Sequence, residues 1–265
     1  MVASIQSAQN VTLSQTEVGN MNLNLNGKNA LIFGSTGGIG KSIALSMIAE
    51  GANVYINGRT EEKCQVIAKE IGAAGYYAGD LSQEKVARKI VDRFLADNKN
   101  IDIIVTNTGG PKKGNFSEVT IEQWKEDYQS LWLSVVESLQ VALPAMSKNK
   151  YGRVLMVTSI AAKEPLPGLT TSNGLRAGLE GLAKSMANEY SKDGITFNLL
   201  LPGYTNTDRI KALNLSEDKI KEMVPAGRLA EPEELANLAT YLSSPLAGYI
   251  TGQSIAIDGG VLKSF

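Results

Sequence analysis

The chain has 265 residues, of which 43% are hydrophobic and 20% are charged, and its formal net charge is -1. This composition is typical of a globular α/β protein, and the near-neutral charge gives no electrostatic reason to expect nucleic acid or an anionic membrane as a partner. The sequence contains no histidine and a single cysteine, Cys64, which excludes imidazole catalysis, histidine-ligated metal sites and an internal disulfide, so we expect no metal centre.

The N-terminal residues 1–24 are mostly polar and include no lysine or arginine. They match neither a secretory signal, which needs a basic start and an apolar core, nor an arginine-rich transit peptide. We therefore expect residues 1–24 to form a flexible arm and residues 25–265 to form one domain. No apolar run approaches the ~20 residues that a membrane-spanning helix needs. Together with the lone cysteine, this predicts a cytoplasmic protein.

A glycine-rich stretch lies between an apolar run and a helical pattern. Residues 30–33 are apolar, glycines follow at positions 34, 37, 38 and 40, and apolar residues then recur at helical spacing over 39–48. This order predicts a strand, a tight turn and a helix. Such a turn aims backbone N–H groups and the positive end of the helix dipole at one point, where a phosphate is the natural ligand.

Three interpretations of this turn compete. It can be a tight connection that binds nothing. It can be a P-loop, because Gly40, Lys41 and Ser42 resemble the end of that motif, but Ser35 stands where the P-loop requires a glycine. It can also be a dinucleotide-binding turn with the spacing Gly34-x-x-x-Gly38-x-Gly40. The sequence downstream of the turn distinguishes the three.

Strands and helices are predicted in alternation along the rest of the chain. Strands are predicted at 53–57, 75–79, 101–106, 152–159, 195–201 and 254–257. Helices are predicted at 61–71, at about 86–94 with Ser82 as its cap, from a Thr120–Gln123 capping box to about 146, at 172–193 and at 232–242. This alternation predicts a single α/β domain with a doubly wound parallel sheet, which binds ligands beyond the carboxyl ends of its strands.

The residues after the second and third strands favour a particular dinucleotide. An NAD site usually has a carboxylate after the second strand, whereas an NADP site has a cation that pairs with the 2′-phosphate. Here Gly58 and Arg59 follow that strand, which favours NADP, with a solvated surface arginine as the alternative. Asp80 and Leu81 follow the third strand, where a carboxylate can bind an adenine amino group and a leucine can contact the ring.

Taken together, these motifs resemble the short-chain dehydrogenase/reductase family over about residues 25–260. The glycine turn matches the family's TGxxxGIG motif with Phe33 in place of threonine, and Asn107-Thr108-Gly109 matches its NNAG motif. The resemblance implies a single-domain Rossmann fold with a seven-stranded parallel sheet, NADP(H) as cofactor, a small-molecule substrate and a homotetramer or homodimer. It assigns the cofactor to Gly34, Ser35, Thr36, Gly38, Ile39, Gly40, Arg59, Asp80, Leu81, Asn107, Thr108, Gly109, Arg176, Pro202, Gly203 and Thr205.

The catalytic positions that the resemblance implies are largely replaced. Ser159 keeps the serine that polarises the carbonyl, but Ser172 stands where the family has its proton-transferring tyrosine. Arg176 replaces the lysine and Leu131 replaces the asparagine that holds a water. An aliphatic hydroxyl is a far weaker acid than a phenol, whose pKa is ~10, and one arginine cannot tune it to neutrality. Because Arg176 lies one helical turn from Ser172, it can still reach the ribose, so we expect cofactor binding to survive and the usual proton transfer to be lost.

Several groups are candidates for a substitute proton donor. They are Lys112, Lys113, Lys163, Tyr204 and a water held by Ser159 and Ser172, each with a solvated loop residue as the alternative interpretation. Residues 206–230 are predicted to form a substrate lid. Its basic residues can attract a carboxylate or phosphate, or can belong to a solvated helix face that nearby acidic residues offset.

The remaining motifs resemble a subgroup labelled 3-oxoacyl-carrier-protein-reductase-like. The resemblance implies an NADP(H)-dependent oxidoreductase acting on a carbonyl or hydroxyl group with an atypical active site. A dinucleotide-binding sensor or partner protein with little turnover is the alternative. By the same resemblance, the two long helices at 120–146 and 172–193 are expected to form the subunit contact.

Overall fold

The computed structural model describes residues 22–264, so most of the predicted N-terminal arm lies outside the described residues. Within the described part, Leu23 already packs against the apolar core and Leu25 is buried in it. The chain therefore joins the domain from Leu23 onward.

Seven parallel strands form one sheet in the order β3-β2-β1-β4-β5-β6-β7, as expected. The strands are β1 (Asn29–Ile32), β2 (Asn53–Gly58), β3 (Gly75–Ala78), β4 (Ile103–Asn107), β5 (Gly152–Val157), β6 (Ile195–Pro202) and β7 (Gln253–Ile257). Every residue of β5 and β6 is buried, because helices cover both faces of a parallel sheet. The strand order reverses between β1 and β4, and ligands of such sheets bind at this switch point.

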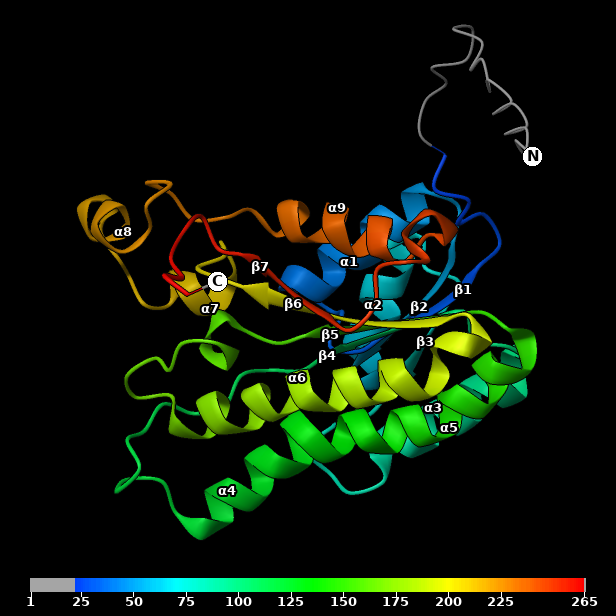
Figure 1. Ribbon diagram of the computed structural model, residues 1–265, viewed down its shortest axis with the longest axis horizontal. Coiled ribbons are helices and arrows are strands. Elements are labelled where there is room, and N and C mark those ends of the chain that lie inside the picture. The colour runs from blue at the N-terminus through cyan, green and yellow to red at the C-terminus, as the bar shows by residue number, and fades with distance from the viewer. Residues whose placement is uncertain (1–21, 265) are drawn as a thin grey trace, which may run out of the picture.

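Helices cover the sheet in two layers (Figure 1). They are α1 (Gly38–Ala49), α2 (Glu61–Ile71), α3 (Val86–Asn98), α4 (Ile121–Tyr128), α5 (Ser134–Asn149), α6 (Thr170–Tyr190), α7 (Asp208–Lys211), α8 (Glu217–Met223) and α9 (Pro232–Leu242). One apolar core, which includes Phe33, Phe94 and Phe197, lies between the sheet and α3, α5 and α6. A second core lies between the sheet and α1, α2 and α9. The predicted doubly wound α/β domain is therefore confirmed.

Two predicted helix starts are corrected by local hydrogen bonds. Ser82 does not cap the third helix, because its N–H and hydroxyl both donate to Asp80 Oδ1, at 3.0 and 2.8 Å, and α3 begins only after Lys85. Thr120 does cap α4 by accepting from the Gln123 N–H. The Gln123 side chain donates to Asp127 Oδ1 instead of returning to Thr120, so the capping box is only half formed.

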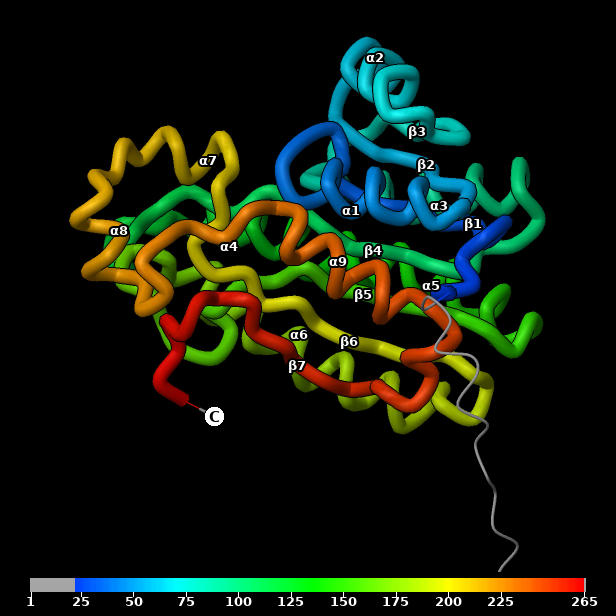
Figure 2. Tube along the Cα trace, turned by 90° about the horizontal axis from the view of Figure 1, so that it is seen from above, coloured from blue at the N-terminus to red at the C-terminus, as the bar shows by residue number. Residues whose placement is uncertain are grey.

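The predicted lid, residues 206–230, leaves the domain and returns to it at adjacent points. The Asn206 N–H donates to the Ala230 carbonyl at 2.7 Å, and the Ala230 N–H donates to the Tyr204 carbonyl at 2.9 Å. Between these bonds the chain forms α7 and α8, which project together from one end of the molecule (Figures 1 and 2). The lid therefore has a fixed base next to the end of β6.

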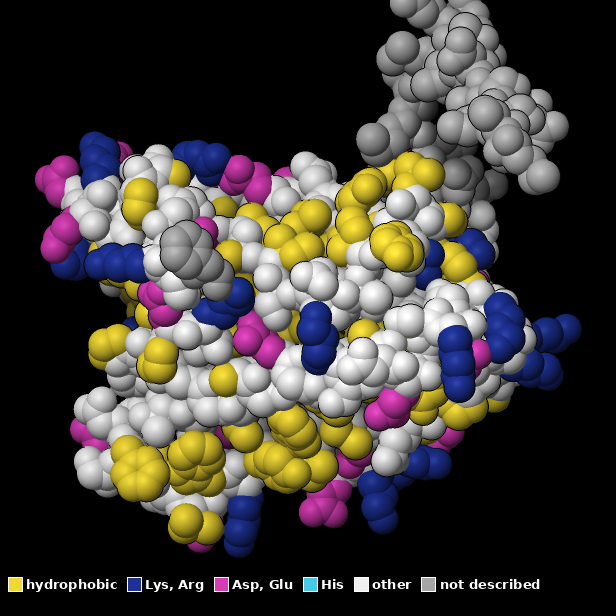
Figure 3. Space-filling view, in the orientation of Figure 1, with side chains coloured by type: hydrophobic (Ala, Val, Ile, Leu, Met, Phe, Trp, Pro, Cys, Tyr) yellow, Lys and Arg dark blue, Asp and Glu magenta, His cyan; other side chains and the backbone are white. Residues whose placement is uncertain are grey.

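The outer surface of α4, α5 and α6 carries exposed apolar side chains and an apolar groove. Figure 3 shows hydrophobic side chains gathered along the lower edge of the molecule, where Figure 1 places these helices. Ile121 and Tyr128 of α4 are 64% and 42% exposed, and an apolar groove of about 260 Å³ between α5 and α6 is lined by residues that include Leu139, Leu143 and Met186. The homodimer or homotetramer stays a prediction, and this surface is where we expect the subunits to meet.

An exposed ion pair stabilises the return of the lid and the start of α9. Arg228 Nη1 and Nη2 donate to the two carboxylate oxygens of Glu234 at 2.7 and 2.8 Å, and the Glu231 N–H donates to the same carboxylate at 2.8 Å. The Arg228 hydrogen bonds, with that backbone N–H, lower the pKa of Glu234 to about 2. The carboxylate is therefore charged over the whole range in which proteins are usually handled.

Replacing Glu234 by glutamine is expected to weaken the acid dependence of stability. Because the folded pKa lies below the unfolded value of ~4.3, the stabilisation is present above that value and is lost as the pH falls toward about 2. The effect is small because the pair is exposed. Melting temperatures at about pH 7 and about pH 3 should differ more for the unaltered protein than for Glu234→Gln, with Glu217→Gln as the control. Equal differences for all three proteins would contradict this.

Candidate active site

The turn between β1 and α1 has the geometry of a phosphate site. Gly34 and Gly38 have φ values of 56° and 52°, a region that glycine adopts readily and other residues avoid. At Gly37 the reason for a glycine is different: an added Cβ would meet no protein atom within 4 Å, so the space beside it is open. Within residues 22–264 no side chain caps the N-terminus of α1, so the N–H groups of its first turn are left without a side-chain acceptor. This arrangement fits a diphosphate.

Two asparagines hold the turn in place. Asn107, the last residue of β4, donates through Nδ2 to the carbonyls of Phe33 and Gly34 at 3.3 and 3.0 Å. Asn57 in β2 accepts from the Gly34 N–H at 3.3 Å and donates to the Tyr77 carbonyl at 2.8 Å. Asn107 is among the predicted cofactor residues, whereas Asn57 has no predicted role. A signal for Asn57 exists, because it is a polar residue that directly follows residues 54–56 of β2 (Val-Tyr-Ile).

Ser35 and Thr36, two predicted cofactor residues, face the protein. The Ser35 side chain is fully buried, donates to the Ile32 carbonyl at 2.6 Å and accepts from the Asn57 N–H at 3.0 Å. The Ser35 N–H also donates, to the Asn57 carbonyl at 2.8 Å, so both the hydroxyl and the N–H of Ser35 are committed within the protein. The Thr36 methyl group fills the space beside Gly58, where an added Cβ would overlap it. The carboxylate side chain that an NAD site usually has after the second strand is absent from position 58, and a side chain there would collide with Thr36.

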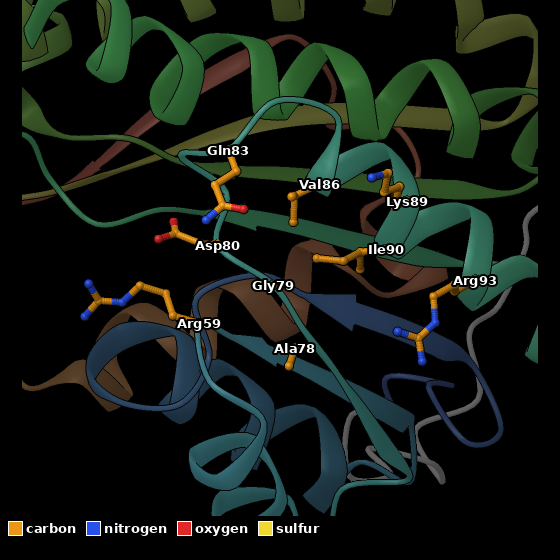
Figure 4. Close-up of a pocket in the computed structure, with 9 residues that line it drawn as sticks. All are labelled: Arg59, Ala78, Gly79, Asp80, Gln83, Val86, Lys89, Ile90 and Arg93. Atoms are coloured by element: carbon orange, nitrogen blue, oxygen red, sulfur yellow. The ribbon is translucent and has the colours of Figure 1, made fainter. Parts of the chain in front are cut away.

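A cavity of about 350 Å³ opens beyond β2 and β3 (Figure 4). Arg59 and Asp80 lie at one end of it, and Lys89 and Arg93 lie at the other. Three cations and one carboxylate give this cavity a positive balance, which suits a ligand with a phosphate group. Leu81 does not line the cavity, because its side chain packs in the core under α3.

The predicted catalytic pair lies at the carboxyl end of β5. Arg176 of α6 is only 6% exposed, and its guanidinium donates to Ser172 Oγ and to the Val157 carbonyl, both at 3.2 Å. Val157 is the last residue of β5 and pairs with Asn107 of β4, which supports the glycine turn. Arg176 therefore lies at the end of the strand next to β4. Burial, together with the charge of Arg209, lowers the pKa of Arg176 to about 10. Arg176 therefore remains a cation at neutral pH.

The other predicted catalytic positions surround this pair in the fold. Ser159 caps a short 3₁₀ turn, because its Oγ accepts from the Ala161 N–H at 3.1 Å. Leu131 lies in a π-helical turn, Gln129–Leu133, which joins α4 to α5 and breaks the single helix expected there. Such turns recur at functional sites. Leu131 is 2% exposed, so an apolar, buried side chain occupies the position of the water-holding amide.

The remaining predicted residues lie on loops at the same edge of the sheet. Gly109 has open space around it, whereas an added Cβ on Gly203 would lie 2.7 Å from Asp258 Cα. Pro202 ends β6, and Thr108 is half-buried. Thr205 is buried, and its hydroxyl donates to the Gly203 carbonyl at 3.3 Å. The hydroxyl of Thr205 is therefore turned toward the backbone.

The candidate proton donors are less well placed. Lys112 and Lys113 are exposed on the loop after β4, and Lys163 and Tyr204 are half-buried. Ser172 and Arg176 are hydrogen-bonded to each other and to Val157, and in residues 22–264 no hydrogen bond joins either of them to Lys112, Lys113 or Tyr204. The group that replaces the tyrosine as proton donor stays a prediction.

The fold and these loops define a dinucleotide-binding α/β oxidoreductase domain. A family model described as enoyl-(acyl carrier protein) reductase matches residues 34–262, and the chain belongs to the short-chain dehydrogenase/reductase family. Within residues 22–264, no three His, Cys, Asp or Glu side chains are grouped so that they could hold a metal ion, and every helix is too short or too polar to span a bilayer.

Named relatives cover almost the whole described domain. The 3-oxoacyl-(acyl-carrier-protein) reductase FabG of Escherichia coli (strain K12) is 32% identical over 243 residues, which is 90% of this chain and 99% of the relative. Its counterpart in Aquifex aeolicus (strain VF5) is also 32% identical, over 91% of this chain and 100% of the relative. Among solved structures, YwfH, an NADPH-dependent reductase of bacilysin biosynthesis, superposes with a TM-score of 0.87 at 28% identity, over 91% of this chain and 100% of that one. L-Sorbose reductase from Gluconobacter frateurii, complexed with NADPH and L-sorbose, has the same TM-score and identity, over 92% of this chain and 100% of that one.

Proposed function

We propose that the protein binds NADP(H) at the carboxyl edge of its sheet and reduces a carbonyl compound, or oxidises the matching alcohol, with Arg176 and Ser172 in place of the usual lysine and tyrosine. The observation that carries the proposal is the position of Arg176. It is a buried cation that donates to the carbonyl of Val157 at the end of β5. Val157 pairs with Asn107, which supports the glycine turn. The structural relatives described with NADPH or NADP support the choice of cofactor.

The residues present fit this cofactor along its length. The N-terminus of α1 and the open space at Gly37 suit the diphosphate, and Arg59 suits the 2′-phosphate. Asp80, in the same cavity, is placed to accept from the adenine amino group. Arg176 is placed to donate to the ribose next to the nicotinamide. When bound, NADPH supplies a hydride to the carbonyl carbon of the substrate.

The protein must then deliver a proton to the substrate oxygen. Ser159 donates a hydrogen bond to the carbonyl oxygen and polarises it. Ser172 accepts from Arg176 through Oγ, so its own hydrogen is free to point toward the substrate and to pass on a proton taken from water. An alcohol is too weak an acid to donate outright. The absence of a tuned acid costs about 10²- to 10⁴-fold in rate, so slow turnover is expected.

Turnover is tested by following the loss of NADPH absorbance with ketones, quinones and short acyl thioesters. The proposal predicts slow oxidation with at least one class of substrate. Saturable NADPH binding without oxidation across the panel would favour the second candidate, a sensor or partner protein that binds the nucleotide. That candidate is favoured by Ser172 and Leu131, which together remove the phenol and the water-holding amide.

Replacing Arg59 by leucine is expected to weaken NADPH binding by about 10- to 100-fold and to leave NADH binding almost unchanged, because a hydrogen bond to a charged group contributes ~1.5–3 kcal/mol. Fluorescence titration of both nucleotides measures this. Lys89→Gln removes a charge from the other end of the same cavity (Figure 4) and serves as the matched control. An equal loss for both nucleotides in Arg59→Leu would show that Arg59 does not bind the 2′-phosphate.

A further inference from the structure

The lid carries an arginine that reaches back to the loop after β4. Arg209 belongs to α7, and its Nη2 donates to the Pro111 carbonyl at 3.0 Å. Its guanidinium lies directly on Gly110, where an added Cβ would overlap it. The side chain remains exposed, so a ligand can reach it. Gly110 is therefore a position where the absence of a side chain makes room for Arg209.

Arg209 and Arg176 lie at the ends of neighbouring strands. The loop that holds Arg209 follows Asn107 of β4, and Asn107 pairs with Val157, whose carbonyl accepts from Arg176. The charge of Arg209 also contributes to the lowered pKa of Arg176. The two guanidinium groups thus act on each other electrostatically at the same edge of the sheet.

No acidic side chain neutralises this pair. The ion pairs found within residues 22–264 involve neither Arg176 nor Arg209. Lys112 and Lys113, which follow Pro111 on the same loop, are exposed and add further positive charge. Bringing cations together without a counterion is costly. An arrangement of this kind is suited to an anion that arrives from solution.

The proposed function assigns the phosphates of the cofactor to other groups. It gives the 2′-phosphate to Arg59 beyond β2 and the diphosphate to the N-terminus of α1. The ribose hydroxyls assigned to Arg176 are neutral. The substrate is therefore the remaining source of negative charge next to Arg176 and Arg209.

We propose that Arg209 determines substrate specificity by binding the carboxylate of an oxo-acid substrate, or of the matching hydroxy acid. The reaction itself rests on the proposed function. Arg209 Nη2 is already committed to the Pro111 carbonyl, and the N–H groups that remain can donate to a carboxylate.

The test compares oxo acids with their neutral methyl esters. Pyruvate, acetoacetate and levulinate place the carbonyl progressively farther from the carboxylate. Calorimetry measures their binding to the protein with and without NADP⁺, and NADPH absorbance measures kcat/KM. We expect at least one acid to bind and to be preferred over its ester, and Arg209→Gln to reduce both its affinity and that preference by about 10- to 100-fold. Arg209→Lys should recover part of both.

The control is Lys211→Gln, which removes a charge from the same helix without touching the loop, and which should leave the preference intact. If no acid binds, if acid and ester are used equally, or if the two glutamine variants behave alike, the proposal about Arg209 is wrong. A preference for phosphate esters over carboxylic acids would also overturn it. Arg209-dependent binding of an acid to a protein that does not bind NADPH would support the carboxylate site and refute the proposed function.

Discussion

Ser172→Tyr combined with Arg176→Lys is expected to raise kcat/KM for carbonyl reduction by about 10²- to 10⁴-fold. The variant supplies a phenol and a lysine one helical turn apart, on the face of α6 where Ser172 and Arg176 now hydrogen-bond each other. A cation beside a phenol lowers the pKa of the phenol toward neutrality, which an alcohol cannot match. The gain should appear mainly in kcat, because only the proton-transfer step changes.

The matched control is Ser172→Phe with Arg176→Lys, which adds nearly the same volume without the hydroxyl. Ser172 is 4% exposed, so any effect of crowding should be equal in the two double variants. A rate gain for tyrosine alone identifies the missing proton donor as the limit on turnover. Equal rates for both variants, with NADPH binding retained, would show that Ser172 does not stand at the position of the proton donor.

Gly40→Ala is expected to lower the free energy of unfolding by about 1–3 kcal/mol, the usual cost of overpacking, and to abolish NADPH binding. An added Cβ would overlap the Gly34 carbonyl and lie 2.8 Å from Asn107 Nδ2. Because both neighbours belong to the framework of the turn, the turn itself must shift. Denaturant unfolding and NADPH titration measure the two effects.

Gly37→Ala tests the space for the ligand without disturbing the protein atoms that hold the same turn. A methyl group there meets no atom within 4 Å, so stability should change by no more than about 0.5 kcal/mol. The methyl group would enter the space assigned to the diphosphate, and NADPH affinity should fall by about tenfold or more. Unchanged NADPH affinity in Gly37→Ala would place the diphosphate elsewhere.

The sheet, and the edge of it where the candidate site residues lie, could be predicted from the sequence because both depend on local patterns. Apolar runs such as 154–157 become buried strands, and Gly34 and Gly38 mark positions where φ must be positive. Arg176 follows Ser172 by four residues, and one helical turn brought them together as expected. The glycine turn and the Ser172–Arg176 pair each depend on residues that are close together in the chain, so both can be recognised from the sequence alone.

Other features depend on contacts between distant segments. Asn57 joins β2 to the glycine turn, and Arg209 crosses from the lid to Gly110. Nothing in the residues next to them indicates these partners. Ser35 was assigned to the cofactor, although its hydroxyl bonds to the Ile32 carbonyl, since the direction of a side chain in a turn depends on the strands around it. Ser82 failed as a cap because α3 begins only after Lys85, and the Gln123 side chain turns to Asp127 instead of to Thr120.

Fluorescence titration of the purified protein with NADPH and NADH tests the central claim most directly. The account predicts saturable binding of NADPH, with an affinity at least about tenfold higher than that for NADH, because Arg59 and a positive cavity stand where an NAD site has a carboxylate. Binding of neither nucleotide would contradict the assignment of the site at the carboxyl edge of the sheet.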